Sequence, residues 1–253
     1  MNRLDTVFAM EKPLLNIFIT AGYPKIDSLP KLAAGLFKKG VDVIEVGMPY
    51  SDPLADGPII QNASAIAIEN GITIAMIFEQ VKQIRALEST SPILLMGYFN
   101  QVLQIGVESF LKQCQQVGVD GLIIPDLPYD VYMEHYQSLF EEYKIAISFL
   151  VTPQTADERI RALDNACSGF LYIVSDNSLT GSKSDGFNEV QLAYFKRIKQ
   201  LNLKSATMIG FGISSKKMAD DANKYSNGAI IGSAYLEAIR NNVEIGFIDS
   251  LTQ

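Results

Sequence analysis

Short apolar runs alternate along the chain with segments whose apolar residues are spaced as on an amphipathic helix. Eight such runs occur, each followed by a turn with glycine or proline and then by a helical pattern; Leu29, Leu32, Ala33 and Leu36 show the helical spacing. This alternation predicts eight strands separated by helices. The runs are Leu14–Thr20, Val41–Gly47, Ile93–Tyr98, Val119–Pro125, Ile145–Val151, Phe170–Ser175, Ala206–Gly210 and Ala229–Ser233.

Strands joined through helices form right-handed βαβ units and a parallel sheet. The runs are apolar on both faces, as expected of strands that are covered by helices. Eight units in 253 residues fit a closed (β/α)₈ TIM barrel, a single domain over residues 1–253, better than an open doubly wound sheet. The first run continues as Thr20-Ala21-Gly22-Tyr23-Pro24, which lacks the GxGxxG of a dinucleotide-binding turn.

The composition argues against several kinds of binding site and catalytic site. Lys and Arg number 21 against 28 Asp and Glu, for a net charge of −7, which argues against a broad nucleic-acid surface. The single histidine, His135, excludes a His-rich metal centre, so no metal site is expected. Cys114 and Cys167 are far apart with no CxxC, as free thiols in a reducing compartment are. We expect a cytoplasmic protein, since neither a signal peptide nor an apolar run of about 18 residues is seen.

The second run places a carboxylate where a barrel keeps its chemistry, at the carboxyl end of a strand. Alternation puts Glu45 on the same face as Val41 and Val43. Burial raises the pKa of a carboxyl toward the range useful for acid/base catalysis. The alternative is a structural Glu paired with a cation, but no Lys or Arg lies within the eight runs.

The loop after this run, Met48–Pro58, carries Asp52 and Asp56 and is stiffened by three prolines. A second carboxylate near Glu45 allows two acidic groups to take different roles. The alternative is that both aspartates only bind turn backbone.

The last two runs end in the glycine-containing turns Gly210–Ser215 and Gly228–Ala234. Exposed backbone N–H groups at a helix N-terminus bind anions, and barrels often bind phosphate after strands seven and eight. The turns therefore predict a phosphate site, the alternative being that the glycines only shape turns.

Two further features concern the active end. The polar stretch Asp176–Gly186 is a candidate lid, or else an ordinary surface loop. Aromatic residues near strand ends, with Gly47 leaving space for a ring, suit a flat apolar substrate, or else fill the core. They are Phe18, Tyr98, Phe149, Tyr172 and Phe211. No lysine ends a strand, which argues against a Schiff-base aldolase.

The segment Glu45–Gln61 closely resembles the signature of the tryptophan synthase alpha subunit family. Further matching segments are Phe18–Pro24, Gly118–Gly121, Pro125–Pro128, Gly210–Ser214 and Ile231–Ala234. The resemblance implies a lyase that cleaves indole-3-glycerol phosphate by a retro-aldol reaction to indole and glyceraldehyde 3-phosphate.

The resemblance also implies the roles of individual residues. Glu45 would be the acid/base, and Asp56 would bind the indole N–H. Thr180 would pack beside Asp56 when the lid closes. The phosphate would be held by Gly181, Gly212, Gly232 and Ser233. The indole pocket would be lined by Phe18, Tyr98, Leu150, Tyr172 and Phe211.

The family works with a pyridoxal-phosphate beta subunit that receives indole through a channel. The resemblance implies the same partner here, in an alpha2-beta2 tetramer, with no cofactor in this chain. The expected docking surface is the Pro53 loop with a loop at Asn100–Val102. The lid segment Asp176–Gly181 lacks the glycine usual before Thr-Gly. A largely non-catalytic partner that activates the beta subunit is therefore an alternative, and an isomerase on a related phosphorylated compound is a weaker one.

Overall fold

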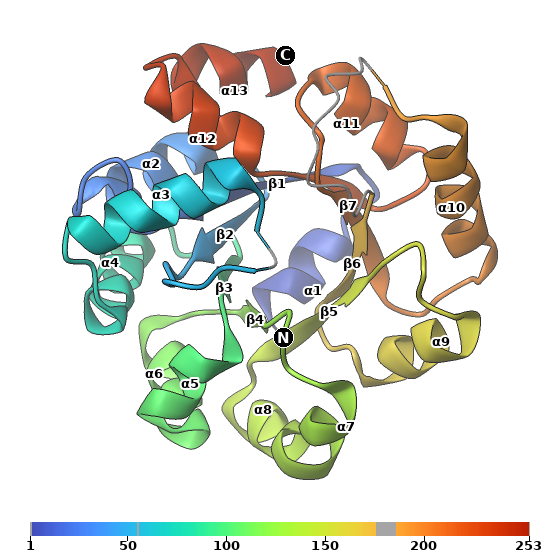
Figure 1. Ribbon diagram of the computed structural model, residues 1–253, viewed down its shortest axis with the longest axis horizontal. Coiled ribbons are helices and arrows are strands. Elements are labelled where there is room, and N and C mark those ends of the chain that lie inside the picture. The colour runs from blue at the N-terminus through green and yellow to red at the C-terminus, as the bar shows by residue number, and fades with distance from the viewer. Residues whose placement is uncertain (1, 55, 176–185, 253) are drawn as a thin grey trace.

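A closed barrel of eight parallel strands, ordered β1 to β8, forms the centre of the computed structural model, which describes residues 2–54, 56–175 and 186–252 (Figure 1). The strands are β1 (Leu14–Thr20), β2 (Val43–Gly47), β3 (Ile93–Met96), β4 (Gly121–Ile123), β5 (Ala146–Val151), β6 (Phe170–Val174), β7 (Ala206–Gly210) and β8 (Gly228–Ile231). The predicted barrel is confirmed. Strand ends differ from prediction by at most two residues, because the apolar runs include buried residues that lie beyond the ladder.

Helices surround the barrel and cover its outer face, except α1, which lies across one end of the barrel (Figure 1). They are α1 (Arg3–Phe8), α2 (Ser28–Lys38), α3 (Pro58–Glu69), α4 (Ile74–Leu87), α5 (Phe99–Ile105), α6 (Val107–Val117), α7 (Tyr129–Val131), the π-helix η1 (Tyr132–Tyr136), α8 (Gln137–Tyr143), α9 (Asp157–Ala166), α10 (Glu189–Gln200), α11 (Lys216–Asn223), α12 (Ser233–Arg240) and α13 (Glu244–Thr252).

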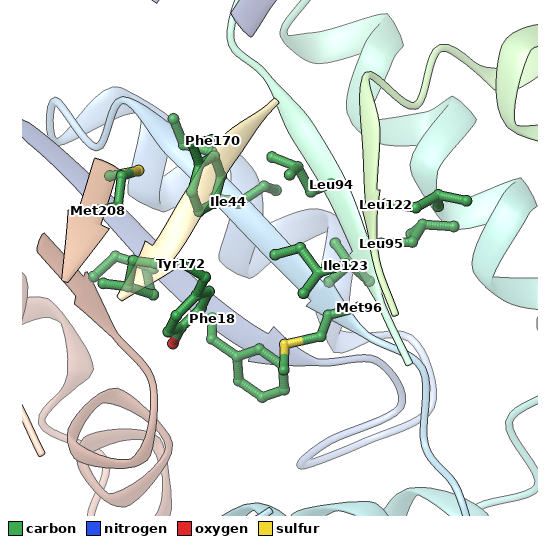
Figure 2. Packing of buried hydrophobic residues seen from close by; sticks show 14 of the residues in the cluster. Phe18, Ile44, Leu94, Leu95, Met96, Leu122, Ile123, Phe170, Tyr172 and Met208 are labelled. Carbon is green, nitrogen blue, oxygen red and sulfur yellow. The ribbon is translucent and has the colours of Figure 1, made fainter. Parts of the chain in front are cut away.

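The strand register decides which side chains share the inner face. Phe18 of β1 pairs with Glu45 of β2, which in turn pairs with Leu94 of β3. Paired residues of parallel strands point to the same face, and Figure 2 shows Phe18, Leu94 and other apolar side chains of this core. Glu45 therefore lies among apolar side chains inside the barrel, where it is fully buried.

The predicted loop at Asn100–Val102 is wrong, because these residues lie within α5. Gln101 Oε1 accepts a hydrogen bond of 3.0 Å from the Tyr98 backbone N–H, which caps the helix start. Val102 is fully buried and cannot contact a partner. Of this segment, Asn100 is exposed, and its Nδ2 donates to Tyr50 Oη at 3.1 Å.

The described ranges contain two free thiols, no candidate metal cluster and no candidate membrane-spanning helix. Cys114 is buried in α6 and Cys167 is half-buried after α9, and both are free. Within these ranges no group of three or more His, Cys, Asp or Glu is placed to hold a metal ion. Nor is any helix in them both long and apolar enough to cross a membrane.

Helix α1 covers the amino-terminal end of the barrel, at the side opposite the predicted chemistry. Asp120, just before β4, is almost fully buried and accepts hydrogen bonds from Arg3 Nη1 at 2.8 Å, Arg85 Nη2 at 2.5 Å and Ile93 N at 2.8 Å. One carboxylate thus joins α1, α4 and β3, which gives a structural role to the matching segment Gly118–Gly121.

Replacing Asp120 by asparagine is expected to lower the free energy of unfolding by about 3 kcal/mol, because two guanidinium groups lose their counter-charge at a buried site. Denaturant unfolding at pH 7 measures the loss. The control is Asp249→Asn, which removes a surface pair with Lys39 and should cost under about 1 kcal/mol. Equal losses in the two variants would contradict this role for Asp120.

Candidate active site

Glu45 is the most deeply buried carboxyl of the barrel interior. Its Oε1 accepts a hydrogen bond of 2.6 Å from Asn16 Nδ2, and its Oε2 has no hydrogen-bond partner in the described ranges. Burial raises the pKa of Glu45 to about 8, against a smaller lowering by the Asn16 hydrogen bond. The alternative of a structural Glu paired with a cation is wrong, since its partner is a neutral amide. At pH 7 the carboxyl is protonated and able to donate a proton.

Asp56 lies at the end of the loop that follows β2 and is nearly buried. Its Oδ2 accepts a hydrogen bond of 3.2 Å from Tyr98 Oη, and the Tyr98 ring stacks on Tyr50 with centroids 5.0 Å apart. Burial raises the pKa of Asp56 to about 6, with the Tyr98 hydrogen bond opposing it. At pH 7 this carboxyl is therefore mostly ionised, in contrast to Glu45.

The two aspartates of this loop lie in different environments. Asp52 is exposed and accepts a hydrogen bond of 2.6 Å from Ser51 Oγ, while its backbone oxygen accepts one from Leu54 N. Its carboxylate thus binds a neighbouring hydroxyl in the turn, and the alternative that both carboxylates only bind turn backbone stays untested. Asp56 instead lines a narrow pocket at the carboxyl ends of β1 to β3.

This pocket opens beside Asp56 and Tyr98 and is mostly apolar. Glu45 does not line the pocket, but it pairs in register with Phe18, which does. Tyr172 of β6 is fully buried, and its pKa is raised well above the usual value by burial and by the nearby charges of Glu45 and Asp56. The pocket is lined by Phe18, Gly47, Met48, Asp56, Ile60, Ser64, Met96, Gly97, Tyr98 and Pro125.

The space expected at Gly47 is taken by the protein's own Phe18 ring. A Cβ at Gly47 would lie 2.7 Å from Phe18 Cε2, and one at Gly210 would lie 2.6 Å from Tyr172 Cε1. The prediction that Gly47 leaves room for a substrate ring is therefore corrected. Both glycines let an aromatic side chain cross the inner face; of the two rings, Phe18 lines the pocket and Tyr172 does not.

The remaining predicted ring-binding residues divide into two groups. Leu150 is partly buried and pairs with Tyr172 on the inner face, and the Phe211 ring meets Tyr172 edge-on at 5.7 Å. Phe149, one position before Leu150, packs edge-on against Tyr129 and Tyr132 instead. Phe149 therefore fills the core outside the barrel, which was the alternative for the aromatic set.

The two glycine turns differ at the predicted anion site. Gly232 is the residue before α12, and a Cβ there would lie 3.4 Å from Phe18 Cβ, so this helix start lies next to a residue that lines the pocket. Ser233 is the first residue of α12. Gly212 has φ +74° and follows Phe211 with φ +69°, but α11 begins only at Lys216. The turn at Gly212 is thus separate from a helix N-terminus, unlike the prediction.

Thr180 and Gly181, with most of the predicted lid Asp176–Gly186, lie outside the described residues. Asn16 was missed in the sequence, although one signal was present. Asn16 is a polar residue within an apolar run. It lies two positions before Phe18, so alternation along the strand predicts that the two side chains share one face.

Known proteins share both the sequence and the fold of this chain. The family model described as Tryptophan synthase alpha chain matches residues 4–246. A protein of that name from Flavobacterium psychrophilum is 50% identical over 242 residues, which cover 96% of this chain and 95% of the relative. The one from Christiangramia forsetii is 51% identical over 242 residues, 96% of this chain and 94% of the relative.

Solved structures give the same result at lower identity. The tryptophan synthase subunit alpha of Legionella pneumophila superposes with a TM-score of 0.89 at 31% identity, over 100% of this chain and 98% of that one. A chain of the aminoacrylate-bound tryptophan synthase from M. tuberculosis superposes with a TM-score of 0.87 at 28% identity, over 100% and 98%.

Proposed function

The chain belongs to the tryptophan synthase alpha chain family, and from that membership we propose that Glu45 and Asp56 divide its chemistry between them. The alpha chain is a lyase that acts on indole-3-glycerol phosphate and works with a beta subunit. One observation carries the proposal: burial raises the pKa of Glu45 to about 8 and that of Asp56 only to about 6. Two carboxyls whose pKa values are pushed apart can serve as acid and as anion at the same pH.

The cleavage needs one proton delivered and one removed. Protonated Glu45 donates its proton to C3 of the indole ring, which makes an indoleninium cation. Ionised Asp56 accepts a hydrogen bond from the ring N–H and stabilises that cation. The Glu45 carboxylate then takes the proton of the side-chain hydroxyl, which becomes the aldehyde oxygen. The carbon–carbon bond breaks, its electron pair returns to the ring, and Glu45 is protonated again.

The rest of the substrate has matching surfaces around the two carboxyls. The phosphate would be held by Gly181, Gly212, Gly232 and Ser233, of which Gly232 and Ser233 lie at the N-terminus of α12. The flat ring would lie among Phe18, Tyr98, Leu150, Tyr172 and Phe211, and Thr180 would pack beside Asp56 when the lid closes. Backbone donors need no cation, which suits a chain of net charge −7.

For the assembly we propose an alpha2-beta2 tetramer in the cytoplasm, a setting that the two free thiols fit. Pyridoxal phosphate would belong to the beta subunit, and this chain would use no cofactor. The proposed contact surface lies on the loop after β2, where the Leu54 side chain is 88% exposed and large enough to anchor a partner.

The pH dependence of indole release tests the two-carboxyl proposal. We expect kcat/KM to rise as Asp56 ionises near pH 6 and to fall as Glu45 loses its proton near pH 8. The assay is run on the chain alone and with its beta subunit. A profile with neither limb would overturn the division of roles. Stimulation of the beta reaction with no indole release would support the non-catalytic alternative.

A further inference from the structure

Strand β1 carries an amide side chain inside the barrel, where its neighbours are apolar. Asn16 is fully buried and pairs with Val43 of β2 and Ile230 of β8. Its Oδ1 has no hydrogen-bond partner in the described ranges. A buried polar atom without a partner costs about 1–3 kcal/mol. Fold stability alone therefore favours an apolar side chain at this position.

The one hydrogen bond that Asn16 does make is to Glu45. Nδ2 lies 2.6 Å from Oε1, and neither residue has any solvent-exposed surface. We propose that Asn16 is a positioning residue for Glu45, which holds Oε1 and leaves Oε2 as the oxygen that exchanges protons with the substrate. The inference rests on the proposed function, because it assigns a task to an atom of the proposed acid.

The geometry suits both states of the acid. An amide N–H donates to the carbonyl oxygen of the protonated carboxyl as well as to the carboxylate, so Oε1 stays held through the cycle. The bond to the carboxylate is the stronger of the two, so it opposes the effect of burial. Glu45 also faces Phe18 and Leu94 through the register, and the titratable group that senses its charge is Tyr172, which also senses the charge of Asp56.

Asn16→Leu tests this role, because leucine keeps the size of the side chain and removes the donor. We expect the Glu45 limb of the kcat/KM profile to move about one pH unit upward, the scale of one hydrogen bond. We also expect kcat to fall about 10- to 100-fold, because without the Asn16 hydrogen bond the Glu45 carboxyl is no longer held in the orientation needed for proton transfer. KM should change less than about twofold, because Asn16 does not line the pocket.

The matched control is Thr20→Val. Thr20 lies on the same strand and face, and its Oγ1 is also buried without a partner, so its loss should leave the limb in place. A merely structural role for Asn16 would lower stability without moving the limb, and that result would overturn the proposal. If Asn16→Leu does not fold, Asn16→Ala carries the same test, because it also lacks the donor.

A double variant separates this inference from the proposed function. In a Glu45→Gln background, Asn16→Leu should have no further effect on kcat, because the two residues act through one oxygen. If Glu45→Gln is itself fully active, the proposed function fails. If Glu45→Gln has only residual activity, and Asn16→Leu lowers kcat by the same factor in Glu45→Gln as in the unchanged chain, only the role of Asn16 fails.

Discussion

Glu45→Gln is expected to lower kcat for indole release about 1000-fold, because glutamine cannot deliver or accept a proton and a positioned acid/base contributes about 10²–10⁴. The fold should remain intact. The glutamine carbonyl can accept from Asn16 Nδ2, and its Nε2 can donate to the unpartnered Asn16 Oδ1. The measurement is steady-state indole release, with Glu79→Gln on the exposed face of α4 as a control that stays active.

The same variant should be more stable than the unchanged chain at alkaline pH. The pKa of Glu45 is about 8 in the folded chain against 4.5 for an ordinary Glu, so the folded state binds the proton more tightly. The stability that this bound proton gives the folded chain is fully present below about pH 4.5 and is lost as pH rises through about 8. Between pH 4.5 and pH 8 the free energy of unfolding of the unchanged chain should therefore fall by about 4 kcal/mol more than that of Glu45→Gln. Full activity, or no such difference, would contradict the role of Glu45.

Asp56→Asn is expected to lower kcat about 10²- to 10³-fold, the usual effect of removing an electrostatic stabiliser of the transition state. Asparagine still offers an oxygen to the Tyr98 hydroxyl and to the indole N–H, so the loss reports the missing negative charge. KM should change little, because the cation that Asp56 stabilises forms only during the reaction. The limb of the kcat/KM profile near pH 6 should also disappear.

Asp52→Asn is the matched control, since Asp52 lies in the same loop but is exposed and bonded to Ser51. It should keep nearly full activity in the same assay. Equal loss in the two variants would show that the loop, and not the charge of Asp56, matters.

The parts of the structure that depend on local pattern were predictable from the sequence. The strands follow from apolar runs, and the inward direction of Glu45 follows from alternation along one strand. The loop at Asn100–Val102 was mistaken for the same local reason. A short polar helix has too few apolar residues to show helical spacing in the sequence. Its start is instead stabilised by the hydrogen bond between Tyr98 N and Gln101 Oε1.

The features that depend on pairing between strands were not predictable. Asn16 meets Glu45 because β1 and β2 pair in one register, and nothing within either run fixes that register alone. The Phe18 ring lies over Gly47 for the same reason. Glycine in a strand predicts a close approach, but the sequence does not say whether a substrate or a neighbouring strand supplies the ring.

Infrared difference spectroscopy of the carboxyl groups tests the division of roles most directly. The spectrum of the unchanged chain minus that of Glu45→Gln should show a protonated carboxyl band at pH 7, which titrates away near pH 8. The corresponding difference for Asp56→Asn should show mainly an ionised carboxylate at pH 7. An ionised Glu45 at pH 7, with no protonated band in its difference spectrum, would contradict the assignment of Glu45 as the acid.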